Sequence, residues 1–183
     1  MEEILEYYLP FWLPPFGIHI QLDGLSAIFL SLTIILGISI FIYSIRYVKK
    51  DKIRYYSLLT LALLSISVTF MAGDLLNFYI FLEITTITTY LLIIQSKTEK
   101  AFRAGSKYIV MTLLGAALIF LAIMLVHRQI GSYKFSVLRE LSTTGDENLI
   151  RLIYVLFIVG CFIKAGIIPL HTWLPDAHPA APS

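Results

Sequence analysis

Five apolar stretches, each of about 20 residues, dominate this chain. A helix of that length crosses the hydrocarbon core of a bilayer, because each residue adds about 1.5 Å. No water reaches the backbone there, so each stretch must satisfy its own amide and carbonyl groups as a helix. The sequence therefore predicts an all-α integral membrane protein with a single transmembrane domain over residues 1–183. The predicted spans cover residues 24–45, 55–72, 75–95, 106–126 and 149–168.

The composition agrees with a polytopic membrane protein. The chain is 58% hydrophobic and 14% charged, whereas a soluble domain carries about 25% charged residues. The net charge of +2 is too small to imply a nucleic-acid partner. Cys161 is the single cysteine, which excludes an internal disulfide, a four-cysteine iron–sulfur cluster and a cysteine-based zinc site. We expect no cofactor, no metal and no catalytic residue, and any linked redox chemistry would take place on another subunit.

Residues 1–23 form a lead-in that is rich in proline and aromatic residues. Pro10, Pro14 and Pro15 argue against a regular helix in this segment. Tryptophan and tyrosine side chains suit the boundary between membrane and water. The lead-in is therefore predicted to lie at the membrane interface.

The charged residues of the loops predict an orientation. Residues 46–54 and 96–105 are short and basic, and such loops face the cytoplasm. The hairpin at 73–74 and the longer polar loop at 127–148 would then face outside. This alternation predicts a multi-pass protein of the cell membrane with an outside N-terminus and a cytoplasmic C-terminus.

Glu83 lies inside the third apolar stretch. An ionised side chain at mid-membrane costs roughly 2.5–3.5 kcal/mol, so a proton, a cation or water must offset its charge. Helical spacing places Tyr79, Thr86 and Tyr90 on the same face as Glu83. Two interpretations remain at this point: a buried structural group that bonds a partner helix, or part of an ion pathway.

Lys164 is the cation that could meet Glu83 deep in the membrane. Gly160, Gly166 and Pro169 lie around it, so the fifth helix is predicted to be broken or kinked near Lys164. Charged side chains at broken helices recur in transporters, whereas a lysine near a helix end also commonly reaches out to the interface. The later pair His171 and His178, seven residues apart with prolines between them, does not predict a metal site.

Three segments resemble a known family: PFGIHIQLDGLSAIFL, GDLLNFYIFLEITTITTYLLI and FIKAGIIPLHTWLPDAHPAAPS. The family is that of the antiporter-like membrane subunits. It includes the D subunits of Mrp-type sodium/proton antiporters and the homologous proton-pumping membrane subunits of respiratory complex I and of membrane-bound hydrogenases. The resemblance extends over nearly the whole chain, and its most specific part is the run PLHTWLPDAH after the lysine.

The resemblance implies roles for the two charged residues. In this family a glutamate on one helix and a lysine on a later broken helix form the centre of a half-channel, and by position these are Glu83 and Lys164. Lys164 would carry or gate the proton, and Glu83 would modulate it. Candidate accessory groups are Tyr79, Thr86, Lys107 and His171.

The resemblance also implies an incomplete fold. Family members contain two inverted repeats, and this chain matches an incomplete first repeat, as a truncated or split N-terminal part. The first hypothesis is a proton- or sodium-translocating subunit of an Mrp-type antiporter or of a redox-driven complex, such as a hydrogenase, a sulfur reductase or a complex I-like enzyme. The alternative is a non-transporting structural subunit that fills the membrane arm. Expected partners are lipid, other membrane subunits and a chain that supplies the missing half; the chain alone would not be catalytic.

Overall fold

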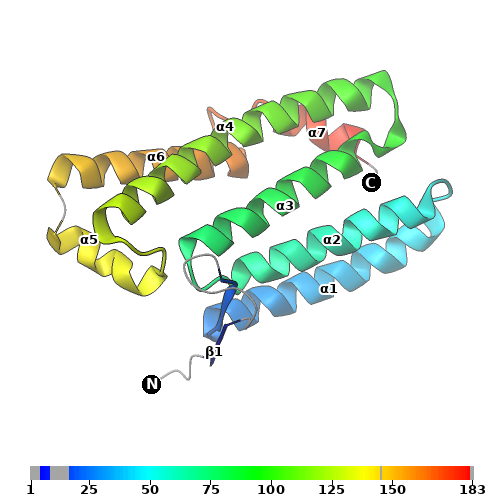
Figure 1. The fold of residues 1–183 in the computed structure, drawn as a ribbon. Coiled ribbons are helices and arrows are strands. Elements are labelled where there is room, and N and C mark those ends of the chain that lie inside the picture. The colour runs from blue at the N-terminus through cyan, green and yellow to red at the C-terminus, as the bar shows by residue number, and fades with distance from the viewer. Residues whose placement is uncertain (1–4, 9–16, 145, 182–183) are drawn as a thin grey trace.

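The fold consists mainly of helices that run the length of the molecule (Figure 1). It is seen in a computed structural model that describes residues 5–8, 17–144 and 146–181. Five of its helices are long and apolar enough to cross a membrane, which confirms the predicted fold class. They are α1 (Gly24–Tyr47), α2 (Lys52–Phe70), α3 (Leu75–Ile93), α4 (Glu99–Ile130) and α6 (Glu147–Ala165).

Shorter elements join and flank these helices. They are β1 (Leu5–Tyr8), β2 (His19–Leu22), the 3-10 turns η1 (Ile94–Ser96) and η2 (Phe135–Val137), α5 (Leu138–Thr144) and α7 (Leu174–Ala180). The strands, η2 and α5 are additions to the sequence prediction, which placed an irregular lead-in and a polar loop there.

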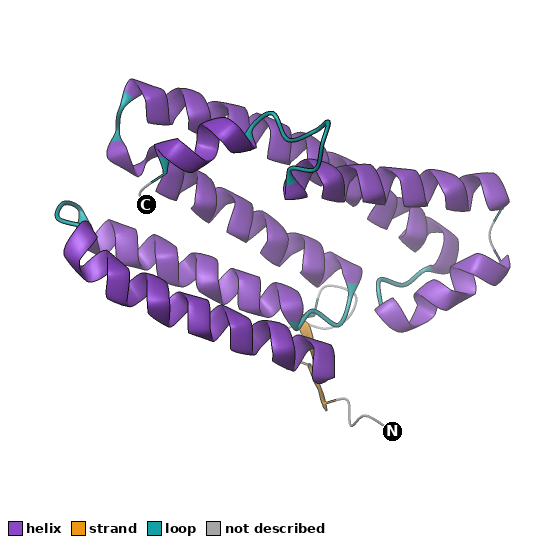
Figure 2. Ribbon diagram, turned by 180° about the vertical axis from the view of Figure 1, so that it is seen from behind, coloured by secondary structure: helices purple, strands orange, loops and turns teal. Residues whose placement is uncertain are grey.

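The described part of the lead-in is a two-stranded antiparallel hairpin, with Tyr8 opposite His19. Figure 2 shows it, in orange, beside the end of the bundle where α2 turns into α3. The Gln21 amide donates a hydrogen bond of 2.7 Å to the Met71 carbonyl in that turn. This contact comes from a distant segment, so local sequence does not reveal the strands. Pro10, Pro14 and Pro15 lie outside the described residues.

Polar side chains at the start of three helices explain where those helices begin. Asp23 accepts a 2.7 Å hydrogen bond from the Ser26 amide, and Asp74 accepts one of 2.8 Å from the Asn77 amide. Thr98 likewise caps α4, whose first residue is seven positions before the predicted start of the fourth span. Such caps satisfy amides that have no partner within the helix.

The helices are arranged so that α4 is the central wall. In Figure 1, α1, α2 and α3 lie side by side, and α4 follows α3 and packs against α6 and α7. The face of α4 that meets its neighbours is built from small and apolar residues, which allow close packing of membrane helices. Its buried members are Ala101, Ala104, Gly105, Tyr108, Thr112, Gly115, Ala116, Ile119, Ala122, Ile123 and Val126.

Helices α4 and α6 meet most closely at two glycines. A Cβ atom placed on Gly160 would lie 2.6 Å from the Gly115 carbonyl oxygen, so no larger residue fits without movement. Gly115 is near the centre of α4, and α6 ends only five residues after Gly160. Helix α6 therefore stops beside the middle of α4, as Figure 1 shows.

Candidate functional site

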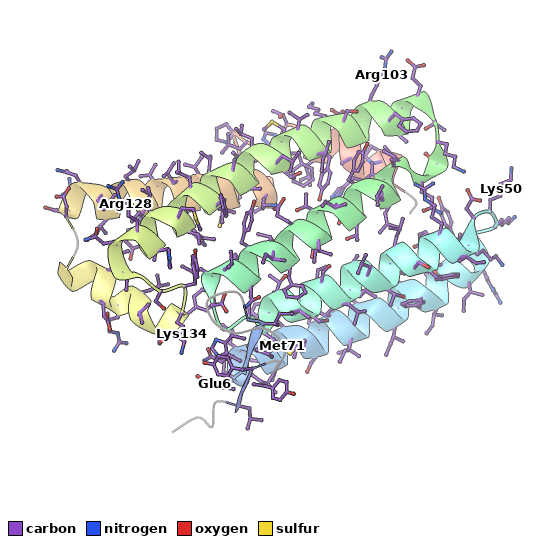
Figure 3. The ribbon with its side chains drawn as sticks, in the orientation of Figure 1. Glu6, Lys50, Met71, Arg103, Arg128 and Lys134 are labelled. Atoms are coloured by element: carbon purple, nitrogen blue, oxygen red, sulfur yellow. The ribbon has the colours of Figure 1, made fainter. Side chains whose placement is uncertain are left out.

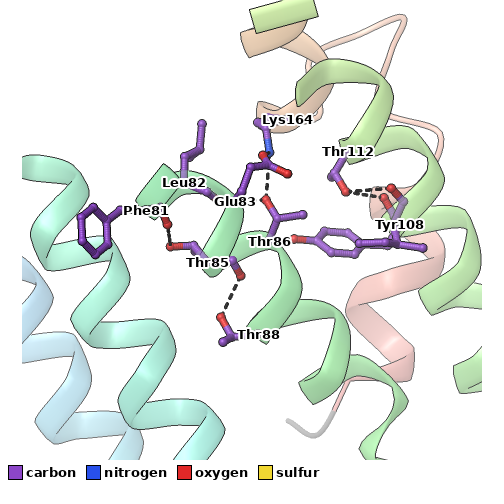
Figure 4. A network of polar contacts seen from close by, with 10 residues as sticks. Phe81, Leu82, Glu83, Thr85, Thr86, Thr88, Tyr108, Thr112 and Lys164 are labelled. Carbon is purple, nitrogen blue, oxygen red and sulfur yellow. Dashed lines mark hydrogen bonds and ion pairs between the residues drawn. The ribbon is translucent and has the colours of Figure 1, made fainter. Parts of the chain in front are cut away.

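A buried ion pair joins α3 to α6. The Lys164 Nζ atom lies 2.6 Å from Oε1 of Glu83 and 2.8 Å from the Thr86 hydroxyl. The exposed fractions of the Lys164 and Glu83 side chains are 10% and 16%. Figure 4 shows both residues beside Thr86, on the side of α3 that faces α4 and α6. The structure thus brings together the two charges that the sequence predicts to interact.

The position of each charge follows from its helix. Glu83 lies near the middle of α3, which begins at the Asp74 cap. The Leu75 amide also donates to the Tyr133 carbonyl at 2.8 Å, which fixes that end of α3. Lys164 lies in the last turn of α6, where the partial negative charge of the carbonyl groups stabilises a cation.

The backbone after Lys164 leaves the helix but keeps hydrogen-bond partners. Gly166 adopts a left-handed conformation (φ +65°), which ends α6, and Ile167 donates to the Phe162 carbonyl at 3.0 Å. The indole N–H of Trp173 donates to the Ile163 carbonyl at 2.9 Å. Non-helical backbone is tolerated at membrane depth when protein groups satisfy it in this way. The break near Lys164, part of the predicted fold, is confirmed.

Two buried residues of α4 are drawn near the pair in Figure 4 and were not predicted. The Tyr108 side chain lies beside Thr86 (Figure 4), and its ring contacts Trp173 edge-on with centroids 5.0 Å apart. Thr112 lies one turn further along α4 and donates to the Tyr108 carbonyl at 2.7 Å (Figure 4). The spacing of small residues along α4 was the signal that could have placed both on a buried face.

The other candidate accessory residues lie at different distances from the pair. Tyr79 is on the same helix as Glu83, and its ring packs on Phe120 with centroids 5.2 Å apart. Lys107 is outside the pair and forms a 2.7 Å ion pair with Asp176 of α7, both about half exposed. His171 lies in the connection to α7, where its Nδ1 atom is buried and has no hydrogen-bond partner among the described residues. Thr86 is therefore the accessory candidate that contacts Lys164 directly.

The fold and the site together define a class of protein: a multi-pass membrane protein with a carboxylate–ammonium pair beside a discontinuous helix. Residues 72–183 match the family described as NADH:quinone oxidoreductase/Mrp antiporter, transmembrane part, and the chain belongs to this family. Residues 13–56 also match the N-terminal family of complex I chain 5. The resemblance stated from the sequence motifs is confirmed.

Two curated relatives illustrate the similarity. The D subunit of the Na⁺/H⁺ antiporter of Bacillus subtilis is 33% identical over 175 residues, which cover 94% of this chain and 36% of the relative. Chain 4 of the NADH-ubiquinone oxidoreductase of Dictyostelium discoideum is 36% identical over 170 residues, which cover 91% of this chain and 31% of the relative. The chain spans about a third of the length of these relatives.

Two solved structures share the fold. A chain of the membrane-bound sulfane sulfur reductase, an archaeal respiratory membrane complex, superposes with a TM-score of 0.83 at 29% identity and covers 96% of this chain and 36% of its own length. A chain of the Mrp complex from Dietzia sp. gives a TM-score of 0.82 at 22% identity, over 97% of this chain and 34% of its own. The chain thus shares its fold with about a third of one membrane chain in each of these two complexes.

Proposed function

We propose that the protein is a proton- or sodium-translocating subunit of such a complex, and that Glu83 and Lys164 lie on the ion path. The observation that carries the proposal is the 2.6 Å ion pair inside the helix bundle. Charged residues within membrane spans are costly and mark ion pathways by default. The similarity to Na⁺/H⁺ antiporter and complex I subunits supports the same function.

The geometry suggests how the pair works. The Glu83 carboxylate stabilises the Lys164 ammonium, which would otherwise be an uncompensated charge in a poorly solvated place. If a change in the complex draws the Glu83 charge away, Lys164 loses that stabilisation and passes a proton to a neighbouring group. Thr86 accepts a hydrogen bond from Lys164 and donates to the Leu82 carbonyl at 3.0 Å. The Tyr108 side chain lies beside Thr86 (Figure 4), so the proposed route of hydroxyl groups begins at the lysine with these two residues. In this proposal Lys164 carries the proton, and Glu83 modulates how readily Lys164 releases it.

The proposed route leads from the pair towards the end of the bundle where Lys107 and Asp176 meet. Tyr108 is one residue from Lys107 along α4, and its ring packs on Trp173 just before α7. Lys107 and Asp176 are about half exposed, so they mark the point where a proton reaches water. His171, with its buried unpartnered nitrogen in the same connection, is a second proton carrier in this proposal.

Orientation and partners belong to the same proposal. The basic connections between α1 and α2 and between α3 and α4 face the cytoplasm, and the β hairpin faces outside. The partners are other membrane subunits, including protein segments equivalent to the second inverted repeat. The complex is of the Mrp type or is a redox-driven complex such as a sulfur reductase, a hydrogenase or a complex I-like enzyme.

A structural subunit is the second candidate function, and one observation favours it. Lys164 already has both Glu83 and Thr86 as partners within the chain, as a static bond between helices would require. In that case the pair only holds α3 against α6, and ions cross the membrane elsewhere in the complex.

Flux measurements separate the two functions. The complex that contains Lys164→Met is compared in proteoliposomes with the wild type and with Lys134→Met, a matched control outside the spans. Proton uptake is followed with a pH-sensitive dye and sodium uptake with an isotope, so the transported ion is also identified. The proposal expects flux to fall about 10²-fold or more in Lys164→Met alone, as for loss of an essential proton carrier. Normal flux in an assembled Lys164→Met complex would contradict ion translocation through Lys164 and would support the structural function.

A further inference from the structure

A basic groove lies at the end of the bundle where α1 meets α2 and α3 meets α4. It has a volume of about 630 Å³ and is lined by polar and charged groups of both connections and by the end of α7. Four of its lining residues are lysines, namely Lys49, Lys50, Lys97 and Lys100. Figure 3 shows Lys50 at this end of the molecule, together with Arg103. The charge of the groove is therefore strongly positive.

One ion pair shapes the groove without cancelling its charge. Lys97 Nζ lies 2.8 Å from Asp51 Oδ2, and both residues have left-handed backbone conformations, with φ of 55° and 51°. Such conformations are costly for residues other than glycine and persist where surrounding contacts hold them. The pair joins the two connections, so lysines from both face one space. Within the described part of the chain, Lys49, Lys50 and Lys100 form no ion pair.

A second, apolar groove continues from the basic one. It has a volume of about 470 Å³ and is lined mainly by side chains of α1, α2 and α3, including Ile40, Leu59 and Leu92. Tyr55 and Ala181 line both grooves, so the two are contiguous. The apolar groove reaches Ser39, eight residues before the end of α1, which is about 12 Å down the helix.

We propose that these two grooves together bind one acidic phospholipid. Its phosphate lies among Lys49, Lys50 and Lys100, and one acyl chain follows the apolar groove between the helices. The position suits this ligand because Lys49 and Lys50 lie between two spans and Lys100 lies in the first turn of a third, where lipid headgroups would be within reach. Each juxtamembrane lysine raises the affinity for anionic lipid about fivefold, and basic pockets between spans bind anionic headgroups. This site is separate from the Glu83–Lys164 pair and does not depend on ion translocation.

The test counts bound lipid by native mass spectrometry on the complex that contains the full chain. The complex is exchanged into mixed micelles of phosphatidylglycerol and phosphatidylcholine. Three variants are compared with the wild type: Lys50→Gln/Lys100→Gln in the basic groove, Leu59→Trp in the apolar groove, and the control Arg46→Gln/Arg54→Gln. The control removes the same charge from the same end, and neither arginine lines either groove.

The proposal expects one retained phosphatidylglycerol in the wild type and the control. Lys50→Gln/Lys100→Gln lowers its affinity about 30-fold, and Leu59→Trp lowers it while the lysines remain. The proposal would be overturned if the arginine control lost as much affinity for phosphatidylglycerol as the lysine variant. It would also be overturned if the wild type showed no preference for phosphatidylglycerol over phosphatidylcholine. A competition arm adds glycerophosphoglycerol, which has the headgroup but no acyl chains, and inorganic phosphate. Displacement of the lipid by either at comparable concentration would show an anion site rather than a lipid site.

Discussion

Lys164 and Glu83 are 81 residues apart in the chain, yet their charged atoms lie 2.6 Å apart between two helices. The contact exists because α6 stops halfway along α4 and presents its last turn to the middle of α3. Much of the structure nearby serves that position: the glycine contact between α4 and α6, the indole bond of Trp173 and the caps of α3. Changes at these supports should therefore disturb the pair without touching it.

Gly160→Ala tests the contact between α4 and α6. The added Cβ would lie 2.6 Å from the Gly115 carbonyl oxygen and would push the helices apart. We expect a loss of about 1–3 kcal/mol in the free energy of unfolding, the usual cost of overpacking. The measurement is the denaturant midpoint in detergent, with the exposed Val155→Leu as control. A midpoint equal to that of Val155→Leu would contradict the close contact.

Trp173→Phe tests the support of the broken helix. The change keeps the aromatic packing on Tyr108 but leaves the Ile163 carbonyl without its indole donor. An unsatisfied buried carbonyl costs about 1–3 kcal/mol, so the thermal midpoint should fall. Tyr154→Phe, on an exposed face of α6, is the matched control. Equal midpoints for the two variants would show that the indole bond does not hold the end of α6.

The Asp51–Lys97 pair predicts a dependence on pH and salt at the basic end. The hydrogen bond from Lys97 holds the pKa of the Asp51 carboxyl below its ordinary value of 3.8. Because the pKa is lowered in the folded state, the stabilisation is complete above pH 3.8 and is lost as pH falls through the lowered value. Amide exchange in residues 48–51, corrected for its intrinsic pH dependence, should accelerate below pH 3.8 and in 1 M salt, since the pair is exposed.

A matched variant gives the control for that experiment. Lys97→Gln should abolish the pH and salt dependence, whereas Lys52→Gln, which keeps the ion pair, should preserve it. Exchange that responds equally in both variants would mean that the pair does not link the two connections.

Orientation is tested by labelling single cysteines after Cys161→Ser. Lys50→Cys and Lys100→Cys lie in the basic connections, and Ser132→Cys lies in the turn after α4. We expect an impermeant maleimide to label Ser132→Cys in intact cells and the other two only after the membrane is opened. Labelling of Lys100→Cys from outside intact cells would reverse the proposed orientation.

Sequence reasoning predicted the parts of the fold that depend on local composition. Apolar length revealed five membrane helices, and the glycines around Lys164 revealed a broken one. The β hairpin was missed because β2 is held by Met71, which belongs to another element. Helix α4 is longer than its apolar stretch because Thr98 caps it and Glu99 pairs with Arg103 at 2.6 Å in its first turns.

The two charged residues of the candidate site were predicted from the sequence, but the neighbouring residues of α4 were not. An isolated glutamate and lysine in apolar stretches are visible in any sequence, because each is costly without a partner. Tyr108 and Thr112 carry no such signal, since hydroxyl groups in a membrane helix can bond their own backbone, as Thr112 does to the Tyr108 carbonyl. The place of Tyr108 beside Thr86 depends on how α4 crosses α3, which only the structure shows (Figure 4).

The most direct test of the account is a double-variant cycle on ion flux. Glu83→Gln, Lys164→Met and the double variant are each assembled into the complex and compared with the wild type in proteoliposomes. If the two residues act as one unit, each single variant loses flux and the double variant is no worse than the worse single one. Unaltered flux in both single variants, in fully assembled complexes, would contradict the account and leave the protein as a structural subunit.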